Sequence, residues 1–129
     1  MSASNPLLAP IDGAIRKEVG GIQCDVVPAG DARVKRTIYW PGFQWETHLK
    51  QVVSTELCMH AHVGMLVQGH VQVVYPDGCK KDFVAPAAVV LEPGHKGWVV
   101  GNEPAVLIEV DFEGDTAKRF GLPATHRHA

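Results

Sequence analysis

Apolar and polar residues alternate along most of the chain in short runs, and glycine and proline separate one run from the next. In the run from Ala32 to Trp40, for example, Val34, Thr37 and Tyr39 are interspersed with charged neighbours. Alternation over four to eight residues is typical of a half-buried β-strand. Several such strands separated by turn signals are typical of a sandwich or barrel, so the pattern predicts an all-β fold.

The expected strands are Gly21–Val27, Ala32–Trp40, Trp45–Val53, Glu56–Gln68, Val71–Tyr75, Lys81–Val84, Ala88–Leu91, Trp98–Val100 and Ala105–Phe112. Between two of them, Pro76-Asp77-Gly78 has the composition of a tight hairpin turn. The segment Asp115–Phe120 predicts a short helix, and Ala124–Ala129 is expected to be a loose tail. We therefore divide the chain into an N-terminal arm (residues 1–20), a barrel (21–114) and a C-terminal segment (115–129).

The composition narrows the class of protein. A chain of 129 residues with 46% hydrophobic and 20% charged residues fits one folded domain. A net charge of −2 provides no electrostatic attraction to nucleic acid or to an anionic membrane, so neither is expected as a partner. No apolar run approaches the length of about 20 residues that spans a bilayer. Three cysteines, an odd number, without a signal-peptide pattern favour free thiols and a cytoplasmic location.

Two segments resemble the sequence motifs of the cupins. The first runs from His60 to Gly69 and continues into the turn at Pro76-Asp77-Gly78, and the second runs from Pro86 to His95. The resemblance extends from about Tyr39 to Phe112. It implies a cupin-type double-stranded β-helix, or jelly-roll barrel. In that family two histidines, a glutamate and a third histidine bind one divalent metal ion inside the barrel.

The first motif departs from the usual pattern and leaves two registers open. In one register, His62 stands at the position of the usual glutamate, and Glu56 and Cys58 lie near the positions of the usual histidine pair. In the other, His60 and His62 are the pair, and Leu66 stands near the glutamate position. The two registers place different side chains toward a metal.

The second motif departs as well. Gly97 stands where the usual ligand histidine would be, and His95 precedes that position by two residues. The chain is also similar to a subgroup of small bacterial cupins, through a Cys-x3-His-x-Gly pattern at Cys58–Gly64 and the Pro-Gly-His turn at Pro93–His95. Either His95 replaces the missing ligand from nearer the barrel mouth, or it faces water and Gly97 keeps a pocket clear.

Strand alternation provides a physical reason to expect a metal. Glu56, Cys58, His60 and His62 would share one face of a regular strand. Such a row is costly to bury unless its polar groups have partners, and a metal ion satisfies several imidazoles at once. The plainer interpretation of Cys58 is a small buried core residue.

We therefore expect one divalent metal ion: zinc, iron, nickel, copper or manganese. Its expected ligands are His48, His60, His62 and His95, and Glu56 is the candidate catalytic base. Two functional hypotheses follow. The protein is a metal-dependent enzyme of the dioxygenase, isomerase or lyase type that acts on a small organic molecule. Alternatively, it is a non-catalytic small-ligand-binding or sensor protein with a structural or vestigial metal site.

A homodimer is the expected assembly, because small jelly rolls leave sheet edges that need to be covered. The segment Leu7–Ile15 is the expected addition to the partner's sheet.

Overall fold

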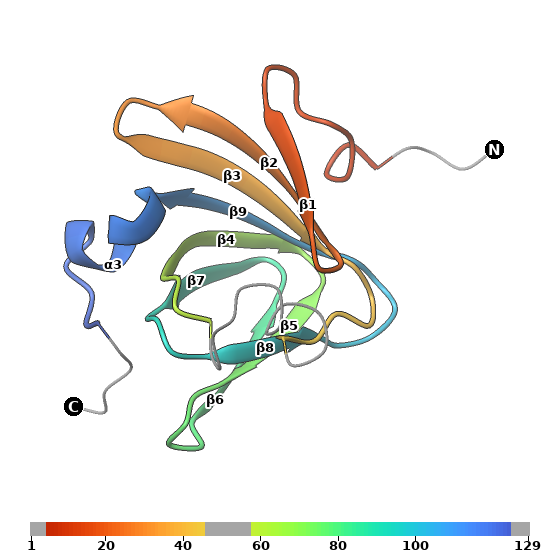
Figure 1. Ribbon diagram of the computed structural model, residues 1–129. Helices are drawn as coiled ribbons and strands as arrows, with labels where there is room; N and C mark the ends of the chain where they lie inside the picture. Colours follow the sequence, from red (N-terminus) through yellow and green to blue (C-terminus); the bar gives the residue numbers. More distant parts are fainter. Residues whose placement is uncertain (1–4, 46–57, 125–129) are drawn as a thin grey trace.

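The computed structural model describes residues 5–45 and 58–124, and β-strands dominate both parts (Figure 1). The strands are β1 (Ile15–Val19), β2 (Ile22–Ala29), β3 (Ala32–Tyr39), β4 (His62–Gln68), β5 (His70–Val74), β6 (Lys80–Val84), β7 (Ala87–Leu91), β8 (Lys96–Val99) and β9 (Ala105–Asp111). A short 3-10 turn, η1 (Glu113–Asp115), leads into the helix α3 (Thr116–Arg119). No helix among these residues is both long and apolar enough to cross a membrane.

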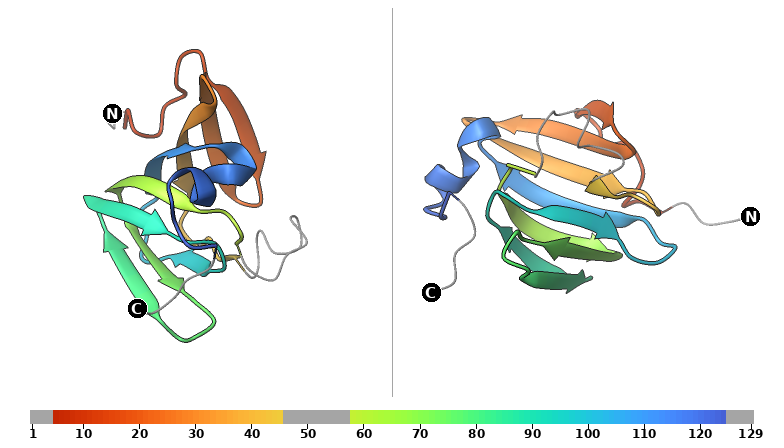
Figure 2. Two further views of the ribbon diagram at one scale, coloured as in Figure 1. Left: turned by 90° about the vertical axis from the view of Figure 1, so that its left-hand side faces the viewer. Right: turned by 60° about the horizontal axis from the view of Figure 1, so that its bottom comes forward.

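The strands form two antiparallel sheets that face each other (Figure 2). The larger sheet has the order β1-β2-β3-β9-β4-β7, and the smaller has the order β6-β5-β8. A hydrophobic core lies between them; it includes Phe43, Trp45, Leu66, Val73, Tyr75, Val89, Leu91 and Leu107. The protein is therefore an all-β jelly-roll barrel, which confirms the fold class predicted from the sequence.

Most of the expected strands correspond to observed ones; one expected strand falls largely outside the described residues, and another is wrong in part. The expected strand Trp45–Val53 lies outside the described residues, apart from Trp45 itself. The prediction of one strand over Glu56–Gln68 is wrong for residues 58–61, since β4 begins only at His62. Cys58 instead forms an isolated bridge with His95, beside the smaller sheet. The segment before β4 thus crosses from one sheet to the other. The side chains that precede His62 therefore do not alternate between two faces as they would in a strand.

The N-terminal region lies against the chain's own larger sheet. Residues 15–19 of the expected arm form β1, an edge strand paired with β2. Upstream of it, the Asn5 amide donates a hydrogen bond to Gln68 over 2.6 Å, and the Ile11 N–H donates to Asp25 over 3.0 Å. These contacts lie on the outer face of the sheet and help to cover the buried ion pair between Asp25 and Arg36.

Strand register determines which side chains of the larger sheet point inward. On β4, His62, Gly64 and Leu66 share the inner face, and Glu109 of β9 lies opposite Gly64. A Cβ on Gly64 would lie 2.0 Å from the Ile108 carbonyl oxygen, so only glycine permits this approach of β4 to β9. The close approach places His62 and Glu109 side by side inside the barrel.

Candidate functional site

Three potential metal ligands converge inside the barrel: Cys58, His62 and His95. One ligand atom of each lies within 4.8 Å of the others. His62 is the first residue of β4, His95 immediately precedes β8, and Cys58 belongs to the segment that precedes β4. Cys58 and His95 are buried, and His62 is largely buried. The group therefore joins the two sheets at one end of the barrel.

Backbone hydrogen bonds hold Cys58 and His95 next to each other. The Cys58 N–H donates to the His95 carbonyl over 2.7 Å, and the N–H groups of Gly94 and His95 donate to the Cys58 carbonyl over 2.7 and 3.2 Å. Gly94 has a positive φ of 97°, a conformation that glycine adopts without strain. The Pro-Gly-His turn thus brings the histidine and the thiol together.

Each imidazole is oriented through its Nδ1 atom. His62 Nδ1 lies 2.8 Å from the Glu109 carboxylate, and its Nε2 lies 3.7 Å from Cys58 Sγ. His95 Nδ1 lies 2.9 Å from the Glu92 carbonyl, to which its N–H donates. In metal sites, the second ring nitrogen of a histidine ligand usually contacts a carboxylate or carbonyl in this way. Both histidines are therefore held as ligands would be: His62 directs Nε2 toward the thiol, and one ring nitrogen of His95 lies within 4.8 Å of Sγ.

The electrostatics of the site favour charged forms of its residues. Burial alone would raise the pKa of the Cys58 thiol, but hydrogen bonds from His60, His62 and His95 hold that pKa well below its ordinary value. Burial would lower the pKa of His62, whereas the nearby charges of Glu109 and Cys58 raise it to about 10. The pKa of the buried Glu109 is lowered by His62 and Lys35 against the opposing effect of burial. A thiolate and a carboxylate close together stabilise positive charge between them.

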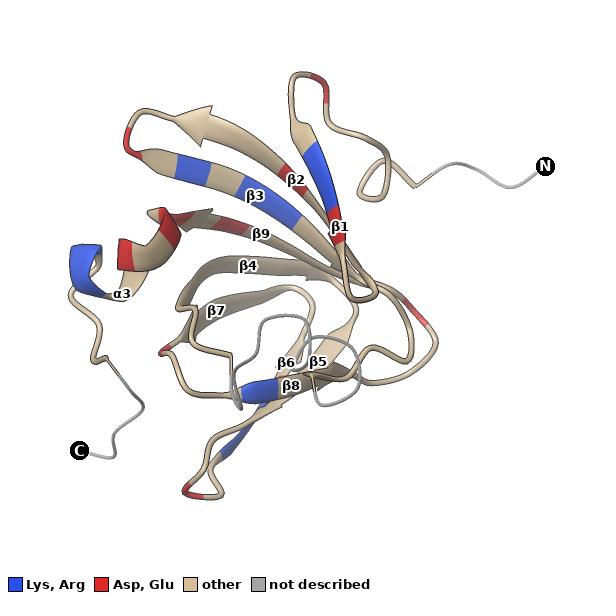
Figure 3. Ribbon diagram, viewed as in Figure 1, with Lys and Arg blue, Asp and Glu red and all other residues tan. Residues whose placement is uncertain are grey.

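A network of ion pairs supports Glu109 from the side away from His62. Lys35 Nζ lies 3.2 Å from Glu109 and 2.9 Å from Asp111, and Arg33 lies 2.8 Å from Asp111. Figure 3 shows these basic residues on β3 and the acidic ones on the adjacent β9. Because Lys35 contacts both carboxylates, the buried charges of the network compensate one another.

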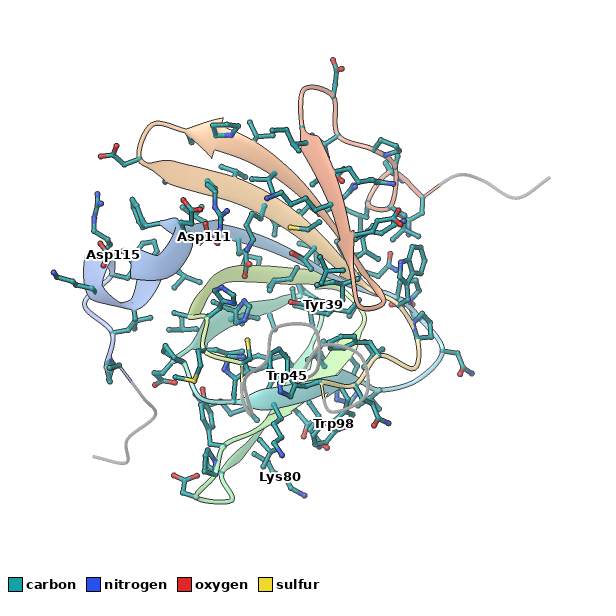
Figure 4. All side chains as sticks on the ribbon, in the orientation of Figure 1. Tyr39, Trp45, Lys80, Trp98, Asp111 and Asp115 are labelled. Atoms are coloured by element: carbon teal, nitrogen blue, oxygen red, sulfur yellow. The ribbon has the colours of Figure 1, made fainter. Side chains whose placement is uncertain are left out.

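The convergent group opens onto a cavity of about 500 Å³ between the two sheets. Its walls are mostly apolar and aromatic; they include Ile22, Tyr39, Phe43, Trp45, Leu66, Val71, Val73, Phe83, Leu91, Val99 and Leu107. Figure 4 shows Tyr39 and Trp45 in the space between the sheets. A volume of this size and lining is typical of a site for a small organic ligand.

Only some of the site residues predicted from the sequence meet in the structure. It brings His62 and His95 together. His60 lines the cavity but is exposed, and it does not belong to the convergent group. His48 and Glu56 lie outside the described residues. His95 is only 4% exposed, so the alternative that it faces water is wrong: its turn folds inward against Cys58.

Sequence reasoning missed the roles of Cys58 and Glu109. Cys58 is buried, as a core residue would be, but its thiol faces two imidazoles. Glu109 is separated from His62 by 47 residues, so no motif connects them. A signal for Glu109 did exist: it is a carboxylate in the apolar strand run Ala105–Phe112, on the same face as Leu107. A charge at an inward position of such a strand indicates a buried partner.

The comparisons with known proteins agree with this architecture. Over 93% of the chain, the structure is similar to a Cupin 2 conserved barrel domain protein from Salinispora arenicola, with a TM-score of 0.57, 20% sequence identity and 98% of that protein covered. It is also similar to a protein of unknown function from Vibrio parahaemolyticus, with a TM-score of 0.54 and 13% identity over 74% of this chain and 96% of the other. No family model and no curated protein matches the chain. The fold is that of a cupin-type barrel, as the sequence motifs implied.

Proposed function

We propose that this protein binds one divalent metal ion through Cys58, His62 and His95, and that the ion faces a cavity for a small organic molecule. The observation that carries the proposal is the orientation of the two imidazoles. Glu109 and the Glu92 carbonyl hold the Nδ1 atoms, and one nitrogen of each ring lies within 4.8 Å of the Cys58 thiol. Burying a thiol and two imidazoles together would be costly without a bound ion that all three contact.

The chemistry of the donors fits a thiophilic metal. One thiolate and two imidazoles suit zinc or copper better than manganese, which prefers oxygen ligands. With three ligands from the described residues, a coordination position would remain open, as in catalytic rather than structural zinc sites. A metal with an open position polarises a substrate oxygen. Glu109 keeps His62 in its orientation, and the apolar walls exclude water from the bound molecule.

We favour a metal-dependent enzyme over a non-catalytic binding protein. An open coordination position beside a cavity favours an enzyme acting on a small molecule over a barrel with a closed structural metal site. A non-catalytic binding protein would use the same cavity, and turnover of a bound molecule is what separates the two.

Metal analysis of protein purified without chelators or a histidine tag tests the proposal. We expect about one metal equivalent per chain, and we expect His62→Ala or Cys58→Ser to lose most of it, because metal binding requires the complete ligand set. His70→Ala is the matched control, because His70 pairs with Asp82 outside the convergent group. Parent protein that stays metal-free after incubation with zinc would overturn the proposal.

A second function is favoured by a separate feature of the geometry. Cys58, His62 and Glu109 form a chain of contacts of 3.7 and 2.8 Å, the arrangement of a nucleophile, a base and an orienting group. In metal-free protein, this chain would make Cys58 a nucleophilic thiol. Faster alkylation of Cys58 than of Cys24 and Cys79, in parent protein that binds no zinc, would support this second function.

A further inference from the structure

Two polar side chains on the cavity wall have no partner among the described residues. Lys17 of β1 lines the cavity and forms no ion pair or hydrogen bond with another described residue. Within the described part of the chain, the Tyr39 hydroxyl on β3 also forms no hydrogen bond, although its ring packs on Phe43 with 5.2 Å between ring centres. Tyr39 is half-buried, and burial and nearby negative charges raise its pKa, so its hydroxyl keeps the proton that it can donate.

Strand register directs both side chains to the same side. Lys17 lies opposite Cys24, which lies opposite Thr37, and Tyr39 lies opposite Ile22, two residues from Cys24 on β2. Residues at these positions share the inner face of the larger sheet. Lys17 and Tyr39 therefore project into the cavity from strands on either side of β2, with Lys17 at the exposed end.

The other charged groups of this wall are already compensated. Lys35 pairs with Glu109 and Asp111, Arg33 pairs with Asp111, and His62 pairs with Glu109. Lys17 thus adds a positive charge that nothing in the described part of the wall balances. A lysine ammonium group donates hydrogen bonds and accepts none, so the group that complements Lys17 is a hydrogen-bond acceptor with negative charge.

The rest of the cavity lining indicates which kind of molecule would carry the negatively charged acceptor group. Apart from the convergent group and the charged residues on β3 and β9, most of the remaining wall is formed by apolar and aromatic side chains, including Phe43, Trp45 and Phe83. Aromatic walls favour flat apolar ligands, since ring pairs add to the gain from burying apolar area. The polar groups and the apolar lining together describe an amphiphilic ligand.

We propose that the cavity binds a small apolar or aromatic carboxylic acid, with its carboxylate toward Lys17 and Tyr39 and its apolar body against Phe43 and Trp45. This inference rests on the proposed function and deepens it, because it names the class of molecule that the cavity takes.

Calorimetric titration with 2-naphthoate and its neutral analogue 2-naphthamide tests the inference. We expect the parent to bind the carboxylate about fivefold more tightly than the amide, the scale of one partly exposed charge interaction. Lys17→Gln and Tyr39→Phe should each weaken naphthoate binding about threefold and naphthamide binding less, because the neutral amide carbonyl accepts a weaker hydrogen bond than the carboxylate. Lys80→Gln is the control, because Lys80 is exposed on β6, away from the cavity (Figure 4).

The titrations are repeated with chelator-treated protein, so that the ligand class and the metal site are judged separately. Preference for naphthoate that depends on Lys17 and Tyr39 in both preparations supports the inference, whatever the metal analysis shows. Equal affinity for the two probes, no binding of either, or unchanged affinity in both variants overturns it. A preference for naphthoate that disappears on metal removal also overturns it, because the carboxylate would then be bound by the metal. Unfolding temperatures of the variants establish that each is folded.

Discussion

Glu109 is the residue on which the orientation of His62 depends. Its carboxylate contacts His62 Nδ1 and Lys35, and it is almost completely buried. We expect Glu109→Gln to weaken zinc binding by about 10- to 100-fold, because the amide loses the charge that favours the ring orientation and ligand basicity. Competition with a chromophoric chelator measures the affinity. Glu103→Gln, at an exposed loop position, should behave like the parent. Equal affinity in both variants would show that Glu109 does not support the site.

Asp25 stabilises the outer face of the larger sheet by compensating buried charge. It accepts hydrogen bonds from Arg16, Arg36 and the Ile11 N–H, and Arg36 is only 4% exposed. We expect Asp25→Asn to lower the free energy of unfolding by about 3 kcal/mol or more, because Arg36 would remain a buried charge without compensation. Urea unfolding at neutral pH measures the change. Asp12→Asn, at an exposed position, should change it by less than about 0.5 kcal/mol.

At the scale of elements, the contact between β4 and β9 depends on Gly64. A Cβ at this position would lie 2.0 Å from the Ile108 carbonyl oxygen and 2.7 Å from Glu109 Cα, and neither backbone atom can move without disturbing the sheet. We expect Gly64→Ala to destabilise the fold by about 3 kcal/mol. Gly114→Ala, where an added Cβ meets nothing within 4 Å, is the control. A Gly64→Ala variant as stable as the Gly114→Ala variant would show that the two strands can separate at low cost.

The pairing of β3 with β9 should also respond to acid through Asp111. Burial alone would raise the pKa of Asp111, but hydrogen bonds from Arg33 and Lys35 lower it from 3.8 to about 2. A carboxyl group whose pKa is lower in the folded state stabilises the fold above its unfolded pKa, and this contribution is lost as pH falls through the folded pKa. We therefore expect part of the stability to disappear between about pH 4 and pH 2.

Thermal unfolding of the parent and Asp111→Asn over this pH range measures that contribution. The variant should lose less stability than the parent, because it lacks the titrating group. Asp115→Asn is the matched control, since Asp115 is exposed in η1 near the same end of the sheet (Figure 4). Parallel curves for the parent and Asp111→Asn would contradict the prediction.

At the scale of the whole molecule, the homodimer expected from the sequence stays a prediction, and the structure suggests where to test it. Val34, Met65, Val90 and Val110 are exposed apolar residues on the outer face of the larger sheet. Clustered exposed apolar residues are typical of interaction surfaces. We expect light scattering to report a dimer at micromolar concentration and Met65→Lys to weaken it.

Val84→Lys is the control for the dimer, because Val84 is exposed on the smaller sheet. A monomeric parent would contradict the dimer, and an unchanged dimer in Met65→Lys would exclude this face. The segment Leu7–Ile15, expected to add to a partner's sheet, lies in the structure against its own sheet through Ile11 and Asp25. Its removal would therefore test folding as well as assembly.

Local patterns were sufficient for the fold class. Alternation over Ala32–Trp40 and Ala105–Phe112 corresponds to β3 and β9, and the turn Pro76-Asp77-Gly78 joins β5 to β6. Alternation and turn residues act between neighbours in sequence, so they can be recognised without a structure. Alternation gave a wrong prediction before β4. The residues between Cys58 and His62 do not continue the strand, because Cys58 pairs with His95 instead.

The sequence by itself determined that this protein is an all-β barrel with His48, His60, His62 and His95 as candidate ligands. Only the tertiary structure decided that Cys58 faces these histidines and that Glu109 orients His62. It also revealed Lys17 and Tyr39 on one wall of the cavity. The physical reason is that the chemical environment of a buried side chain depends on contacts across sheets, between residues far apart in sequence. Strand pairing and sheet packing create those contacts, and no local pattern contains them.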